Sequence, residues 1–93
     1  MSLARVVSFD GVNDERIAQL KADVSGEPPE GLDAKALLIL HDPDAQKAMA
    51  IVFFEDEGAY QRGHEILDSM PASDTPGSRT SVTKYNVAIR REL

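Results

Sequence analysis

Tyr60 and His64 combine reactive side chains with a spacing that can bring them together. Residues four positions apart lie on one face of a helix, so a helix here would place the phenol beside the imidazole. Such a pair could orient a phenolic substrate while the neutral imidazole acts as a base near pH 7. The alternative, which we favour, is that Tyr60 packs at the core edge and His64 is a polar residue of the helix surface. Base catalysis needs a partner that orients the imidazole, and the sequence places none.

A second group of candidate ligand-binding residues consists of Arg79, Tyr85 and Arg5. Arg79 and Tyr85 have the same parity on one predicted strand, so their side chains are expected on one face. Arg5 lies on a strand that should neighbour it, and the three could bind an anionic or carbonyl group. The alternative, which we favour, is an edge-strand arginine paired with a carboxylate, which contributes little to stability.

The other reactive residues do not form a recognisable metal or hydrolase site. His41, Asp42 and Asp44 surround a turn, but no further ligand follows at a suitable spacing. The chain has no cysteine, which excludes disulfides and thiolate metal sites. Its serines lack the nucleophile-elbow motif of hydrolases. We therefore expect no metal and no cofactor, and we assign no catalytic residue.

Six elements are predicted to position these residues, in the order strand, helix, strand, strand, helix, strand. The first strand covers residues 3–9, and the first helix runs from an N-cap at Asn13 to Val24. A β-hairpin at residues 35–55 turns at residues 41–46, where Pro43 lies between aspartates. The second helix follows to Met70, and the last strand covers residues 79–89. Loops rich in Gly and Pro are expected at residues 25–33 and 71–78.

Two residues of the second helix predict how it is placed. Asp56 is expected to cap its N-terminus, with Glu55 and Glu57 adding favourable negative charge there. Gly63 lies on the apolar stripe and costs about 1 kcal/mol of helix propensity against alanine. We expect that the glycine allows the helix to approach the sheet closely.

The hairpin at residues 35–55 is apolar on both faces. Alternate side chains of a strand point to opposite faces, so Ile51 and Phe53 share one face, and Val52 and Phe54 the other. All four are assigned to the core or to a dimer interface, and the sequence does not tell which face meets the helices. Two helices can cover one face of the sheet, and an uncovered apolar face indicates an interaction surface.

The element order predicts an α+β, ferredoxin-like βαββαβ fold, with a four-stranded antiparallel sheet and two helices on one face. The 93 residues are expected to form a single domain, 1–93. A net charge of −6 with no basic cluster disfavours nucleic-acid and anionic membrane partners. The longest apolar run, residues 48–54, is too short to span a bilayer, and no signal peptide is recognised at the N-terminus. We expect a soluble cytoplasmic protein.

Two segments and the βαββαβ order resemble a known superfamily. Residues 50–57, AIVFFEDE, run from a strand into an acidic helix start, and residues 76–87, PGSRTSVTKYNV, close the fold. In this pattern the chain resembles the dimeric α/β-barrel superfamily, close to its antibiotic-biosynthesis-monooxygenase-like group. The resemblance extends over nearly the whole chain as a pattern and not as an invariant motif. It implies a homodimer in which two sheets pack face to face into a barrel.

Members of that superfamily include cofactor-independent quinone-forming monooxygenases, haem-degrading oxygenases, isomerases and many proteins without known activity. The haem-degrading members use a histidine and a tryptophan on the second helix, with an asparagine on the first strand. Here the helix offers His64, but the chain has no tryptophan and residues 3–9 contain no asparagine. Haem degradation is therefore disfavoured, and the fold alone does not specify the chemistry.

Two functions remain open. We favour a homodimeric α/β-barrel module that binds a small ligand or interacts with partners without catalysis, because the catalytic candidates lack a complete constellation. The alternative is a cofactor-independent monooxygenase or isomerase that acts on an aromatic or polyketide-like substrate. The expected partners are a second copy of the chain and a small aromatic ligand.

Overall fold

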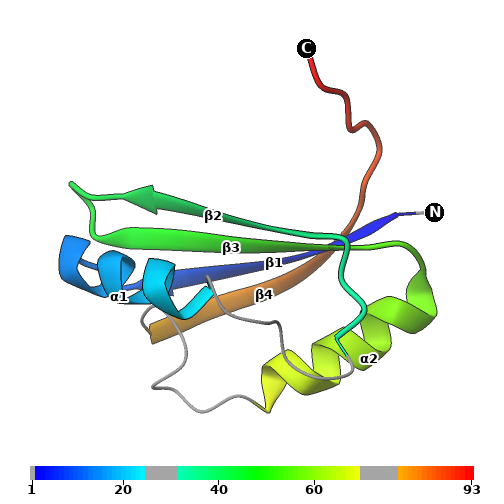
Figure 1. Ribbon diagram of the computed structural model, residues 1–93, viewed down its shortest axis with the longest axis horizontal. Helices are drawn as coiled ribbons and strands as arrows, with labels where there is room; N and C mark the ends of the chain where they lie inside the picture. The colour runs from blue at the N-terminus through cyan, green and yellow to red at the C-terminus, as the bar shows by residue number, and fades with distance from the viewer. Residues whose placement is uncertain (1, 25–31, 70–77) are drawn as a thin grey trace.

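The computed structural model describes residues 2–24, 32–69 and 78–93, and it has the predicted α+β composition (Figure 1). The six elements follow one another along the chain in the expected order, strand, helix, strand, strand, helix, strand. Their bounds are β1 Leu3–Asp10, α1 Asp14–Val24, β2 Ala36–Asp42, β3 Lys47–Phe54, α2 Glu57–Asp68 and β4 Ser78–Asn86. The predicted loops at residues 25–33 and 71–78 fall mostly outside the described residues, and so does Met70.

The four strands form one antiparallel sheet in the order β2-β3-β1-β4. This order places β1 and β3 in the centre and leaves β2 and β4 at the edges. Figure 1 shows α1 and α2 on the same side of the sheet. The arrangement is compatible with the ferredoxin-like fold, as the element order predicted.

Local sequence signals explain where the helices begin. Asn13 Oδ1 accepts a hydrogen bond from the Arg16 amide at 2.8 Å, and Asp56 Oδ1 accepts one from the Ala59 amide at 2.8 Å. Each cap satisfies a backbone donor that the first turn leaves unpaired. Both predicted N-caps are therefore confirmed.

The core lies between the helices and one face of the sheet. Beneath α2, Phe54 is fully buried together with Leu3, Val52 and Ala59. A second cluster of buried residues surrounds Val12, just before α1. Val52 and Phe54 thus belong to the face that meets the helices, while Ile51 and Phe53 lie on the opposite, open face. This settles the face assignment that the hairpin sequence left undetermined.

The last strand differs from its prediction at both ends. It stops at Asn86 and not at residue 89, because its final partner is Leu3, where β1 begins. The Val87 amide still donates to the Ser2 carbonyl at 2.9 Å, and residues 87–93 then leave the sheet. At the other end the register shifts by one residue, because Ser8 pairs with Ser81 and Phe9 pairs with Arg79. Thr80 is the extra residue of this β-bulge.

No helix within residues 2–24, 32–69 and 78–93 is long and apolar enough to cross a membrane.

Candidate functional site

Arg5 is a charged residue that is almost completely buried. Its parity on β1 places it between Leu3 and Val7, on the face that α2 covers, and only 4% of its surface is exposed. Its strand neighbours in register are Val52 on β3 and Lys84 on β4. Arginine is almost never fully buried unless it is paired, so its partners carry information about function.

His64 is the hydrogen-bond partner of Arg5. The Arg5 Nε–H donates to His64 Nδ1 at 3.1 Å across 59 residues of sequence. A nitrogen that accepts a hydrogen bond carries no proton, so this contact requires a neutral imidazole with its proton on Nε2. The interpretation of His64 as simply a polar residue of the helix surface therefore misses its contact with the sheet. It is half-buried and points to the sheet.

Tyr60 lies one turn before His64 on α2 and contacts it. Its ring is stacked with the His64 ring, with centroids 6.0 Å apart and 9° between the planes. It also meets Phe54 edge to face at 5.5 Å. Tyr60 is 5% exposed, so it lies inside the core and not at the core edge, where it was predicted. We call Arg5, Tyr60 and His64 the Arg5 cluster.

Two ion pairs border the Arg5 cluster. Lys84 Nζ donates to Glu57 Oε2 at 2.7 Å and lies 5.1 Å from the centroid of the Tyr60 ring. Arg79 Nη1 lies 2.9 Å from Asp68 Oδ1 at the end of α2. The interpretation of Arg79 as an arginine paired with a carboxylate is therefore confirmed.

The bulge at Thr80 corrects the predicted polar patch. Because of the register shift, Arg79 pairs with Phe9 and lies on the same face as Arg5, whereas Tyr85 pairs with Ala4 on the open face. Tyr85 is 54% exposed there, away from the Arg5 cluster. Of the five predicted ligand-binding residues, Tyr60 and His64 thus lie on α2, Arg5 and Arg79 lie on the sheet face that meets the helices, and Tyr85 lies on the open face.

Lys84, Glu57 and Asp68 were not among the sequence candidates. The sequence contained one indication of the Lys84–Glu57 pair: Lys84 has the same parity as Val82 on a strand that was expected to pair with β1. A lysine on the face that meets the helices needs a carboxylate from a helix, and Glu57 supplies it.

The charge of Arg5 is only partly satisfied. Its Nη2 is buried and has no hydrogen-bond partner among the residues that the structure describes. Burial lowers the pKa of the Arg5 guanidinium, and the Arg79 charge lowers it further, while Tyr60 and Asp68 raise it. The guanidinium is still protonated, because arginine does not lose its proton in proteins. The site therefore contains a buried cation with a free donor.

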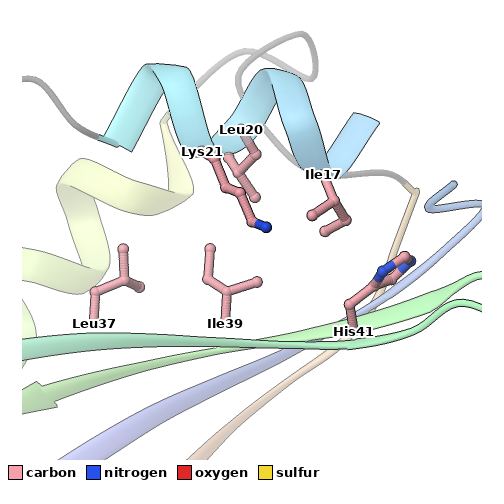
Figure 2. A pocket seen from close by; sticks show the side chains of 6 residues that line it. All are labelled: Ile17, Leu20, Lys21, Leu37, Ile39 and His41. Atoms are coloured by element: carbon pink, nitrogen blue, oxygen red, sulfur yellow. The ribbon is translucent and has the colours of Figure 1, made fainter. Parts of the chain in front are cut away.

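A separate cleft of about 420 Å³ lies between α1 and β2 (Figure 2). Its walls are apolar, with Lys21 and His41 as the polar lining residues. His41 Nε2 donates to the Val12 carbonyl at 2.9 Å, so this imidazole fastens the edge strand to the segment before α1. This hydrogen bond gives His41 a structural role. Among the described residues, no three His, Cys, Asp or Glu side chains gather as a metal site would require.

Comparisons with known proteins identify no relative. No family model, no curated protein and no solved structure matches this chain. The resemblance to the dimeric α/β-barrel superfamily therefore stays a prediction.

Proposed function

We propose that this protein is a homodimeric module of the dimeric α/β-barrel type that binds a small ligand between α2 and the sheet. Two copies would pack their open faces together, and each copy would carry one Arg5 cluster. The chemistry of the cluster supports recognition of a ligand in preference to its conversion.

The observation that carries this proposal is the hydrogen bond from Arg5 to His64. A general base must present a free lone pair to the proton that it abstracts. The lone pair on His64 Nδ1 is occupied by the Arg5 Nε–H, and Nε2 bears the proton. In this state His64 can donate a hydrogen bond to a ligand, and it cannot accept a proton from one.

The open face supports the homodimer. Leu38 and Leu40 on the edge strand are 45% and 47% exposed, and both point to this face. Apolar side chains predominate on this face, with Val6, Met49, Ile51, Phe53 and Tyr85 among them, whereas Ser8, Ser81 and Thr83 on β1 and β4 are polar. The Arg90 guanidinium lies 4.7 Å from the centroid of the Phe53 ring, so the C-terminal segment contacts the same face. A large exposed apolar area on a small protein is typical of a protein interface. A second copy offers the same apolar surface, and a two-fold axis makes it self-complementary.

Sedimentation-equilibrium measurements at micromolar concentration test the dimer. We expect twice the mass of the 93-residue chain. A stable monomer at that concentration would refute the homodimer.

The second candidate is a cofactor-independent monooxygenase or isomerase acting on an aromatic or polyketide-like substrate. The stacking of Tyr60 on His64 favours it, because the two side chains that could handle a phenolic group are in contact. Catalysis would require a ligand to displace Arg5 from His64 Nδ1. Turnover of a quinol that is lost in His64→Ala and kept in Gln61→Ala would establish this candidate over binding alone. Gln61 is a suitable control because it lies on the exposed side of α2.

A further inference from the structure

The cations that face α2 differ in how their charges are balanced. Lys84 is paired with Glu57, and Arg79 is paired with Asp68. Arg5, which is buried, hydrogen-bonds to a neutral imidazole instead. The charge of Asp68 raises the pKa of Arg5 from a distance, but the ion-pair partner of Asp68 is Arg79. The deepest of these cations is therefore the one without a carboxylate partner among the described residues.

A buried charge with an unpaired donor is costly, because the donor has lost its water and gained nothing in return. For Arg5 the cost falls on Nη2, which has no partner within the described part of the chain. An anion that reaches Nη2 would supply both the missing hydrogen bond and the missing charge. Hydrogen bonds between guanidinium and carboxylate are among the strongest in proteins, because both partners are ionised.

We propose that Arg5 Nη2 is the anchor for a small organic monoanion, a carboxylate attached to an apolar or aromatic body. The proposal rests on the ligand-binding function proposed above and names the chemical class of its ligand.

Two features select this class among anions. Arg5 shares its sheet face with Leu3, Val52 and Phe54, which form a buried cluster with Tyr60. An apolar ligand body therefore finds suitable neighbours, whereas a phosphate would have to lose a larger hydration shell. The net charge of −6 also repels a dianion more than a monoanion. The planar fork of arginine also explains why Arg5→Lys should bind a carboxylate less well, because the lysine ammonium is a point charge.

The test compares ligands that differ only in charge. Benzoate and phenylacetate are titrated into the full chain by calorimetry, alongside benzyl alcohol and 2-phenylethanol as their neutral counterparts and inorganic phosphate as the hydrated anion. We expect the two carboxylates to bind at least about tenfold more tightly than the alcohols, because hydrogen bonds to charged groups are the stronger kind. Phosphate should bind more weakly than either carboxylate.

Variants of Arg5 identify the anchor. Arg5→Met should abolish the preference for carboxylates over alcohols, and Arg5→Lys should reduce it. Without ligand, Arg5→Met should unfold at the same temperature as the unaltered protein or a higher one, since replacing a buried, poorly paired charge with an apolar side chain is often stabilising. Arg62→Met is the matched control, because Arg62 is exposed and pairs with Asp33 on the outside of α2. If Arg5→Met does not fold, Arg5→Lys decides.

The outcomes separate this inference from the function on which it rests. Equal binding of alcohols and carboxylates would keep the ligand-binding function and overturn the anion anchor. Stronger binding of phosphate would overturn the carboxylate class, and a preference unchanged in Arg5→Lys and Arg5→Met would overturn the role of Arg5. If none of the probes binds, both proposals fail.

Discussion

Glu57 links the first turn of α2 to the edge strand β4 through Lys84. Its Oε1 also accepts a hydrogen bond from Gln61 Nε2 at 3.2 Å. The hydrogen bond from Lys84 is the largest cause that lowers the pKa of the Glu57 carboxyl below its ordinary value, and the bond from Gln61 lowers this pKa further. The folded state thus favours the ionised carboxylate. The resulting stability is fully present above the ordinary pKa and is lost as the pH falls through the lowered one.

Lys84→Met should raise the pKa of Glu57 towards the ordinary value, because it removes the largest cause of the shift. The folding stability of this variant should then fall less steeply as the pH is lowered into the acid range. An NMR titration of the Glu57 carboxyl carbon measures the first effect, and urea unfolding at a series of pH values measures the second. Lys47→Met is the control, because Lys47 lies near Asp10 at the other end of the sheet. Identical Glu57 titrations in both variants would contradict the assignment.

The candidate site was predictable only in part at the level of residues. Spacing alone predicted that Tyr60 and His64 share a helix face, and their stacked rings confirm it. That Arg5 is the partner of His64 depends on how α2 lies across β1, which no local pattern encodes. Arg79 reaches the same side only through the bulge at Thr80, and a bulge depends on the pairing partner as much as on the bulged strand.

Gly63 shows at the level of elements why α2 can lie so close to the sheet. A Cβ atom built on this residue would lie 2.3 Å from Phe54 Cε1 and 2.4 Å from Phe54 Cζ. Phe54 is fully buried, so its ring has little room to move away. The close approach that the glycine predicted is confirmed.

Gly63→Ala should destabilise the protein by about 1–3 kcal/mol, the usual cost of overpacking a core, even though alanine is the better helix former. Thermal and urea unfolding measure this loss. Gly58→Ala is the matched control in the same helix, because its added Cβ would meet only the ends of the Arg62 and Asp56 side chains, at 3.3 and 3.5 Å. That variant should be neutral or slightly more stable. A Gly63→Ala protein as stable as Gly58→Ala would contradict the packing argument.

The order and type of the elements could be predicted because each has a local signal. Alternating side chains marked β1, capping residues marked both helix starts, and Pro43 marked the hairpin turn. The end of β4 had no such signal. Its β-branched pattern continues to residue 89, but β1 begins at Leu3, and the hydrogen bond from the Val87 amide to the Ser2 carbonyl does not extend the ladder. The length of an edge strand is set by its neighbour, which lies far away in sequence.

At the scale of the whole molecule, substitutions at two adjacent residues of β3 should have different effects, because their side chains lie on opposite faces of the sheet. Val52→Asp should unfold the chain, because Val52 is 6% exposed beneath α2 and a buried unpaired charge costs several kcal/mol. Phe53→Asp should leave the chain folded but monomeric, because Phe53 lies on the open face proposed to meet a second copy. Circular dichroism reports folding in both variants, and sedimentation equilibrium reports association. A dimer of unchanged affinity in Phe53→Asp would place the interface elsewhere.

The edge position of β2 has a consequence for how this protein behaves when it is concentrated or partly unfolded. An edge strand offers unpaired backbone donors and acceptors to any other strand, and apolar side chains make such pairing persistent. β2 has exposed leucines on both faces, with Leu37 on one and Leu40 on the other. Charged residues bound this segment, Lys35 before it and Asp42 at its end, in the positions where gatekeepers limit fibril growth. β2 thus has a charged residue at each end, and these charges should limit the amyloid-like addition of further strands to it.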